Sequence, residues 1–147
     1  MLHVIYLGVY KPKLLDDVSY VAKKIGYTNA MFVHGLDGLD EISLLGKTRI
    51  NQLKNGNIKS FEISPELFEL TRRTLEDIKT GSPQVNAQTI IGVFDGSIKG
   101  PHKDAILLNA SGALMVGGKA TDFKEGIKLA RKIIDSGKAL KKLNELK

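Results

Sequence analysis

Ala30-Met31-Phe32-Val33-His34 is the stretch that decides the fold of this chain. It is short, apolar and rich in strand-forming residues, with Thr28-Asn29 before it and Gly35 after it. A continuous apolar run of this length, bounded by turn residues, predicts a strand that is buried on both faces of its sheet. Such a strand needs covering helices, so we expect an α/β protein.

The residues before this strand predict a helix and a further strand. Lys11-Pro12-Lys13 places a proline in the first turn of a helix, and Gly26 ends the pattern. The apolar residues between them at helical spacing are Leu14, Leu15, Val18, Val21, Ala22 and Ile25. Residues 4–10 form a second β-type run, so the order predicts a parallel β-α-β unit with a right-handed crossover.

Residues 48–63 predict an antiparallel hairpin appended to this unit. Two β-type runs, residues 48–53 and 58–63, flank Asn55-Gly56, and Asn-Gly between such runs is a strong hairpin signal. The rest of the chain is predicted to be helical, with Ser-Pro openings at Ser64-Pro65 and Ser82-Pro83. The helical segments are expected at about residues 64–67, 83–95, 102–116, 122–134 and 138–146.

Length and composition limit what the chain can be. With 147 residues, 42% of them hydrophobic, it is long enough for one core, so residues 1–147 are expected to form one domain. The absence of cysteine excludes disulfides and thiolate zinc sites. No basic-apolar leader or run of about 18 apolar residues is found, so we expect no membrane partner and a cytoplasmic location.

The net charge of +6 raises the question of nucleic-acid binding. Residues 119–147 hold nine Lys or Arg against four Asp or Glu, so the excess lies at one end of the chain. There the basic residues lie beside a predicted buried helical stripe, made of Phe123, Ile127, Ala130 and Ile134. No aromatic residues alternate with the basic ones, so a solvated helix face is expected rather than a nucleic-acid site.

An adjacent acidic pair, Asp40-Glu41, follows the buried strand in a glycine-containing loop. Ligands of open α/β sheets bind beyond the carboxyl ends of the strands, which is where this loop lies. Two carboxylates without cysteine or paired histidines favour a hard cation held by oxygens, and Mg²⁺ typically takes one or two protein carboxylates together with phosphates and water. Neighbouring side chains of a regular strand diverge, so the pair can share one ion only if Gly35 and Gly38 make the backbone irregular. From the residues alone, an ordinary capping role for the pair stays open.

Three further motifs carry less weight. Gly46-Lys47-Thr48 resembles the end of a phosphate-binding loop, but Glu41 stands where that loop needs its first glycine. Asn109-Ala-Ser111 fits a glycosylation signal, yet it lies in a predicted helix of a chain without a secretion signal. His34 ends a strand near the acidic pair, and a lone histidine there is more often structural than catalytic.

Three long segments, in the same order and spacing, resemble anthranilate phosphoribosyltransferase. They are Phe32-Val-His-Gly-Leu-Asp-Gly-Leu-Asp-Glu-Ile-Ser43, Gly100-Pro-His-Lys-Asp-Ala-Ile-Leu-Leu-Asn-Ala-Ser111 and Glu125-Gly-Ile-Lys-Leu-Ala-Arg-Lys-Ile-Ile-Asp-Ser-Gly-Lys-Ala-Leu140. The resemblance covers the C-terminal part of the family's chain and implies an α/β domain of the nucleoside phosphorylase/phosphoribosyltransferase type. That family transfers phosphoribose from phosphoribosyl pyrophosphate (PRPP) to anthranilate in tryptophan biosynthesis. By resemblance, Asp40 and Glu41 bind the Mg²⁺ that accompanies the pyrophosphate.

The chain also departs from the family pattern. The Gly-Thr-Gly-Gly-Asp phosphate loop, the Lys-His-Gly-Asn segment, an anthranilate-binding arginine and the N-terminal helices have no counterpart in it. The resemblance therefore implies contact with PRPP through magnesium, and with anthranilate only when the N-terminal portion is supplied. We expect the isolated chain to be inactive, and to self-associate or to bind a complementary N-terminal polypeptide. The alternatives are part of a pyrimidine-nucleoside phosphorylase and a non-enzymatic nucleic-acid-binding relative.

Overall fold

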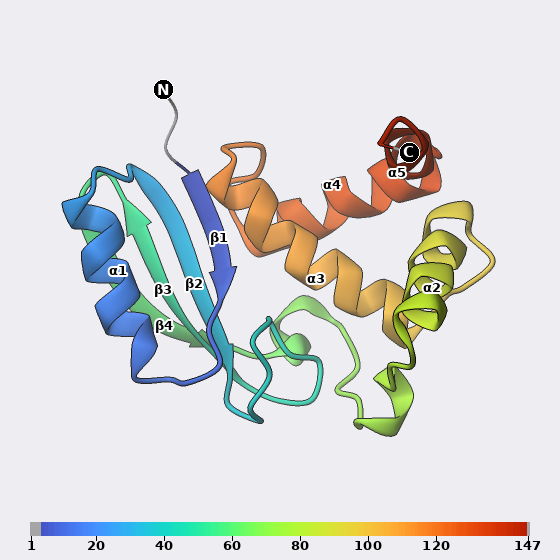
Figure 1. Cartoon of the computed structure of the whole chain (residues 1–147), viewed down its shortest axis with the longest axis horizontal. Coiled ribbons are helices and arrows are strands. Elements are labelled where there is room, and N and C mark those ends of the chain that lie inside the picture. The colour runs from blue at the N-terminus through green and yellow to red at the C-terminus, as the bar shows by residue number, and fades with distance from the viewer. Residues whose placement is uncertain (1–3, 147) are drawn as a thin grey trace.

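The computed structural model describes residues 4–146, which form a four-stranded sheet with helices on both faces (Figure 1). The strand order is β1 (Val4–Gly8), β2 (Asn29–Gly35), β3 (Thr48–Lys54) and β4 (Asn57–Ile63). β1 and β2 are parallel, whereas β2, β3 and β4 pair in antiparallel order. The predicted fold class, a parallel β-α-β unit extended by an antiparallel hairpin, is confirmed.

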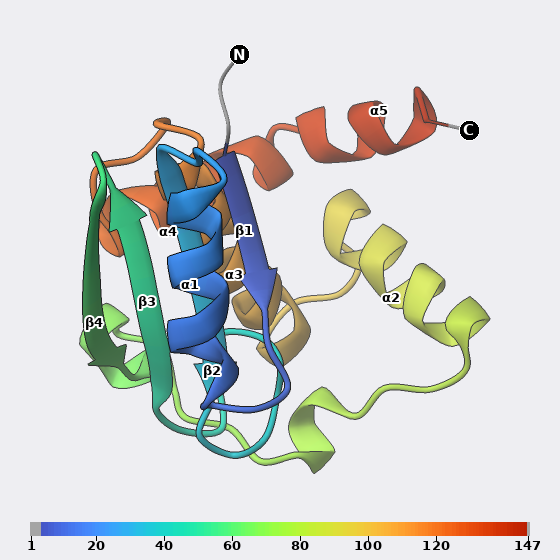
Figure 2. The same ribbon diagram turned by 60° about the vertical axis from the view of Figure 1, so that its left-hand side comes forward.

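Strand β2 is buried on both faces, as its apolar run predicts. Ala30 and Phe32 face helix α1 (Leu14–Lys24), where they join Leu15 and Ala22 in one apolar cluster. Met31 and Val33 point the other way, into the larger cluster beneath α3 and α4. This alternation places one strand between two helical layers, which Figures 1 and 2 show on opposite sides of the sheet.

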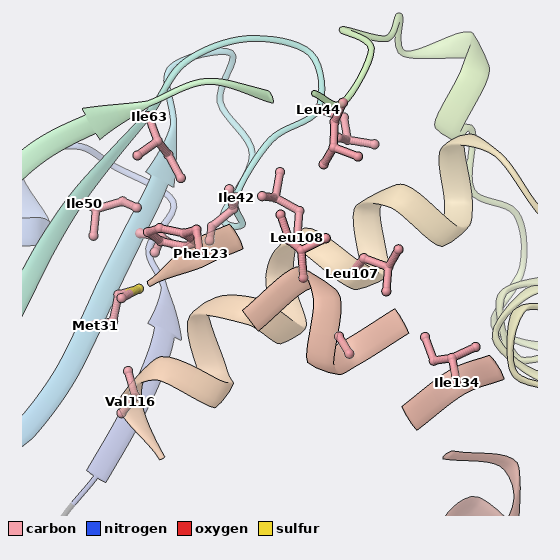
Figure 3. Close-up of a cluster of buried hydrophobic side chains, with 14 of the residues drawn as sticks. Met31, Ile42, Leu44, Ile50, Ile63, Leu107, Leu108, Val116, Phe123 and Ile134 are labelled. Atoms are coloured by element: carbon pink, nitrogen blue, oxygen red, sulfur yellow. The ribbon is translucent and has the colours of Figure 1, made fainter. Parts of the chain in front are cut away.

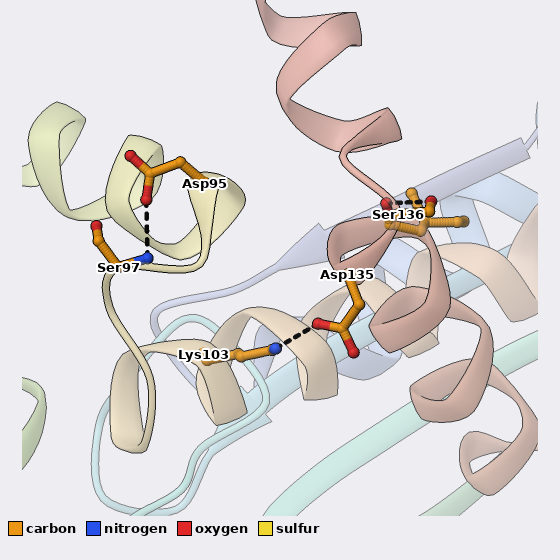
Figure 4. A network of polar contacts seen from close by, with 6 residues as sticks. Asp95, Ser97, Lys103, Asp135 and Ser136 are labelled. Carbon is orange, nitrogen blue, oxygen red and sulfur yellow. Dashed lines mark hydrogen bonds and ion pairs between the residues drawn. The ribbon is translucent and has the colours of Figure 1, made fainter.

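The larger cluster connects the sheet to the C-terminal helices (Figure 3). Helices α3 (Pro101–Val116) and α4 (Phe123–Asp135) supply Leu107, Leu108 and Phe123, which pack with Ile50 of β3. The predicted stripe of α4 is confirmed, because all of its members are buried: Phe123, Ile127, Ala130 and Ile134. Lys103 of α3 also donates a 2.6 Å hydrogen bond to Asp135 of α4, which joins the two helices at their exposed ends (Figure 4).

The turn of the hairpin has the backbone that its sequence demands. Asn55 and Gly56 both have positive φ angles, 50° and 76°, between β3 and β4. Two successive left-handed residues match the twist of the flanking strands, and Asn-Gly adopts them at low cost. The hairpin prediction from the sequence is therefore confirmed.

The remaining helices begin and end at the expected signals. The short 3₁₀ turn η1 (Pro65–Phe68) follows Ser64, and α2 (Pro83–Asp95) is capped by the Ser82 hydroxyl and ended by Gly96, which has a φ of 84°. Asp122 accepts a 2.9 Å hydrogen bond from Glu125 N and begins α4. Helix α5 (Lys138–Asn144) lies with α2 away from the sheet (Figure 1).

Four details differ from the sequence prediction. α1 begins at Leu14, so Pro12 lies before the helix rather than in its first turn. β1 pairs only to Gly8 rather than to residue 10, because Tyr10 turns outward and is 66% exposed. A second 3₁₀ turn, η2 (Glu76–Ile78), lies in a segment for which no helix is predicted. α5 ends two residues early, at Asn144. None of the helices formed by residues 4–146 is both long and apolar enough to cross a membrane.

Candidate magnesium site

The acidic pair lies in the loop of residues 36–47, which we call the acidic loop, between β2 and β3 (Figure 1). The loop leaves the sheet at the carboxyl ends of the parallel strands β1 and β2. This is the end of an α/β sheet at which ligands bind. Asp40 is exposed and Glu41 is half-buried, so the location predicted from the sequence is confirmed.

The first half of the acidic loop is an irregular turn. Gly35 N donates to Leu39 O at 2.8 Å, and Gly38 N donates to Gly35 O at 2.9 Å. Gly38 has a φ of 101°, which a residue with a side chain rarely adopts. The backbone before the acidic pair therefore departs from a regular strand.

The far end of the acidic loop is fixed by buried hydroxyl groups. Ser43 N donates to the Thr48 hydroxyl at 2.9 Å, and Leu45 N donates to the Ser43 hydroxyl at 2.9 Å. The Ser43 hydroxyl also bonds Asp37, whose other carboxylate oxygen accepts from Leu39 N at 3.2 Å. Both oxygens of Asp37 are therefore engaged within the loop.

Asp40 and Glu41 differ from Asp37 in having no such partners. Within residues 4–146, neither side chain makes a hydrogen bond or an ion pair. The pKa of Glu41 is raised, first by burial and then by the negative charges of Asp40 and Asp37. A bound cation would relieve this effect on the Glu41 carboxylate.

Glu41 also faces into two neighbouring hollows. One has a volume of about 260 Å³ and is bordered by Lys79, Asn86 and His102, while the other, of about 240 Å³, is bordered by Leu39 and Lys79. A larger cavity of about 470 Å³ lies between α3 and α4, but its walls are almost entirely apolar. Glu41 lines both of the smaller hollows, and the exposed Asp40 lies beside it.

Four basic side chains in or beside the acidic loop make contacts within the chain. Lys47 pairs with Glu62 at 3.4 Å, and Lys79 pairs with Glu76 at 3.5 Å. Arg72 donates to Leu45 O at 2.5 Å, and Arg73 pairs with Asp104 at 3.5 Å. Among the described residues, then, no free basic side chain neutralises Asp40 or Glu41.

The His34 side chain is buried and hydrogen-bonded to the backbone. Its ring is 5% exposed, and Nδ1 donates to Val9 O at 2.7 Å. This bond ties the end of β2 to the segment that follows β1. The structural interpretation of His34 therefore fits its contacts.

The donor set suits a hard divalent ion. Residues 4–146 contain no group of three or more His, Cys, Asp or Glu side chains arranged to hold a metal. Two carboxylates with open space beside them are the usual protein contribution to Mg²⁺ when phosphates and water complete the shell. The residues present thus fit a magnesium ion shared with a phosphorylated ligand.

Asn109 is the residue near the site that sequence reasoning missed. It lies on α3, yet it bonds both backbone polar groups of Ile42, which directly follows Glu41. The sequence holds one signal for it, an amide in the middle of an otherwise apolar helical run, residues 105–110. A polar residue in such a run usually satisfies a buried partner.

Comparisons with known proteins identify the family of the chain. A family model described as "Glycosyl transferase family, a/b domain" matches residues 2–140. Anthranilate phosphoribosyltransferases from Petrotoga mobilis and Azospirillum brasilense are 41% and 46% identical to the chain over 140 residues. These alignments cover 95% of the chain but only 40% and 39% of the relatives, so the chain spans about two fifths of their length.

Solved structures show the same similarity. Anthranilate phosphoribosyltransferase from Saccharomyces cerevisiae in complex with PRPP and Mg has a TM-score of 0.88 at 29% identity, covering 97% of this chain and 41% of that one. The enzyme from Thermus thermophilus has a TM-score of 0.83 at 33% identity, covering 94% and 40%. These relatives favour the anthranilate enzymes over the nucleoside phosphorylase alternative. The chain therefore belongs to the glycosyl transferase family, as an a/b domain similar to that of the anthranilate phosphoribosyltransferases.

Proposed function

We propose that this chain supplies the magnesium-binding part of an anthranilate phosphoribosyltransferase, an enzyme of tryptophan biosynthesis. The proposal rests on two neighbouring carboxylates, Asp40 and Glu41, that have no hydrogen-bond or ion-pair partner among the described residues. They lie on a fixed loop at the carboxyl ends of the parallel strands. Relatives from Saccharomyces cerevisiae have been solved with PRPP and Mg and with 4-fluoroanthranilate, which supports these ligands for the complete site. A cytoplasmic location is part of the proposal.

In this reaction the bond from the sugar carbon to the pyrophosphate oxygen breaks, the carbon bonds the amine of anthranilate, and that nitrogen loses one proton to solvent. Positive charge develops on the sugar and negative charge on the leaving pyrophosphate. Bound Mg²⁺ stabilises the latter charge without a proton donor. Asp40 and Glu41 act by holding and orienting their ligand in the ionised state, so neither serves as an acid or a base.

The proposal assigns the basic part of the site to another polypeptide segment. Lys79 is the one Lys or Arg among the described residues that line the two hollows beside Glu41, so we infer that further cations for the phosphates come from elsewhere. The relatives are about two and a half times as long as the matched region, which leaves room for such a segment. We infer that the chain alone has little or no transferase activity.

The open edge of β1 is a surface to which a second segment can bind. β1 is an edge strand among residues 4–146, and its Val4 and Leu7 side chains are 36% and 41% exposed. An open edge with apolar side chains can pair with an added strand. We infer that a complementary N-terminal polypeptide, or a second copy of the chain, covers it.

The test is a reconstitution assay. Phosphoribosyl transfer to anthranilate is measured with the chain alone, and again after adding the part of the Petrotoga mobilis enzyme that the chain does not match. Activity is expected only in the mixture, and Asp40→Asn/Glu41→Gln should abolish it. Asp17→Asn/Glu69→Gln, which removes the same two negative charges at exposed positions, serves as the matched control.

Two results would overturn parts of the proposal. Full activity of the chain alone would remove the need for a second segment. Undiminished activity of the double variant in the mixture would remove the magnesium role of the acidic pair. Size measurement of the chain at several concentrations tests whether the open edge of β1 binds another polypeptide. A chain that stays monomeric and does not bind the added segment contradicts that role of β1.

A further inference from the structure

The side-chain amide of Asn109 makes four hydrogen bonds that link three separate parts of the fold. Its Oδ1 accepts from Ile42 N at 2.9 Å and from the Tyr6 hydroxyl at 2.8 Å. Its Nδ2 donates to Ile42 O at 2.9 Å and to Ala105 O at 3.1 Å. An amide has two acceptor and two donor sites, so this one is fully used. The two carbonyl partners also fix its orientation, because a carbonyl cannot donate.

Ile42 is the point at which this amide acts on the acidic loop. Both backbone polar groups of Ile42 are bonded by the same side chain, as a neighbouring strand would bond them. The Ile42 side chain is 1% exposed and lies in the larger core cluster. Since Ile42 directly follows Glu41, these contacts fix the position of the backbone next to the acidic pair.

Tyr6 gives the arrangement a second support. The pKa of Tyr6 is raised above its usual range by burial and by the charge of Glu41, so the hydroxyl keeps its proton and can donate to Asn109. Gly112, one turn beyond Asn109, lets the ring approach, because a Cβ there would lie 2.6 Å from Tyr6 Cε2. The helix surface is thus shaped to receive this ring beside the amide.

We propose that Asn109 is a positioning residue that sets the geometry of the Asp40-Glu41 pair through its two bonds to Ile42. The inference rests on the proposed magnesium role of the pair. Asn109 does not reach the ion in this arrangement, because its four hydrogen-bonding sites are occupied by protein groups. It resembles the outer partners that orient metal ligands elsewhere, whose removal weakens metal binding by about 10- to 100-fold.

The test compares metal binding with stability. Mn²⁺, a paramagnetic substitute for Mg²⁺, is titrated against the unaltered chain and the variant Asn109→Leu, and the thermal unfolding of each is measured without metal. Mn²⁺ binding by the folded variant is expected to weaken by about 10- to 100-fold. Val116→Ala, a core truncation at the far end of the same helix, should lower stability and leave the Mn²⁺ affinity of the folded chain unchanged.

Asn109→Ala is the second variant, because the space it leaves can admit water to satisfy Ile42 and so favours folding. Hydrogen exchange of the amides of residues 40–43 provides a readout that needs no metal. Faster exchange confined to these residues supports the inference, and exchange at the unaltered rate overturns it. Asn109 variants that bind Mn²⁺ within twofold of the unaltered chain also overturn it. If Asp40→Asn/Glu41→Gln leaves Mn²⁺ binding unchanged, the proposed function is refuted instead. The hydrogen-exchange result still decides the role of Asn109 in that case.

Discussion

Gly8 provides the sharpest test of how the acidic loop is held. It ends β1, and a Cβ built on it would lie 1.5 Å from Asp40 O and 2.5 Å from Asp40 C. Both atoms belong to the backbone, so no side chain can rotate out of the way. Carbon and oxygen atoms repel strongly below about 3 Å, so Gly8→Ala requires the loop to retreat by about 1.5 Å.

That displacement sets the expected effect. Overpacking of this kind costs about 1–3 kcal/mol of stability, so the variant should still fold. A shift of about 1 Å in a reacting group can lower a rate by about 100-fold, so we expect reconstituted transfer to fall by at least that factor. Mn²⁺ binding to the isolated variant should weaken in parallel, because Glu41 follows the residue that is pushed.

The assays are Mn²⁺ titration, thermal unfolding and reconstituted transfer, each with Gly117→Ala as the matched control. At Gly117 the nearest atom to a built Cβ is 3.4 Å away, which is an ordinary contact, so this change should leave all three measurements unaltered. If Gly8→Ala binds Mn²⁺ like the unaltered chain and keeps its stability, the contact does not place the acidic loop.

Three smaller predictions concern stability. Glu41→Gln should raise the unfolding temperature of the metal-free chain at pH 7 by a few degrees, since burial, Asp40 and Asp37 all raise the pKa of this carboxyl. The raised pKa means that its protonation stabilises the fold, so calorimetry should show the difference vanish below the ordinary pKa of glutamate; a difference that persists there contradicts this cause. Gly56→Ala should cost about 1 kcal/mol in urea denaturation, because its φ of 76° strains a residue with a Cβ, and an unchanged midpoint would exclude that strain. Asp122→Ala should also cost about 1 kcal/mol by removing the cap of α4, and equal stability would show that the cap adds nothing.

The elements that the sequence predicts well are those specified by neighbouring residues. The apolar run of β2, the Asn55-Gly56 turn and the Ser82-Pro83 opening each act within a few positions, and each appears at the predicted place. β1 is overestimated because its strand-like composition continues to Tyr10, whereas its pairing stops where the chain turns toward α1. Local composition cannot report where a partner strand ends.

The candidate site likewise has features that the sequence predicts and contacts that it does not. The location of Asp40 and Glu41 follows from a strand and a loop that adjoin in sequence. The contacts that hold them come from remote positions, since Gly8 meets Asp40 and Asn109 meets Ile42 only after the sheet and α3 have packed together. The apolar run around Asn109 indicates that this amide has a buried partner, but no spacing pattern in a single sequence shows that the partner is Ile42.

The Tyr6 to Asn109 bond joins positions 103 residues apart, which has a consequence for folding. The cation-binding geometry can form only when the first strand and the third helix have docked, so partly folded chains should lack it. Metal binding then becomes linked to folding, and a ligand that binds only the folded state stabilises it by mass action, by about 2.7 kcal/mol at a hundred times its Kd. The proposed magnesium role thus extends to stability, since bound metal would favour the fully folded chain over partly folded ones.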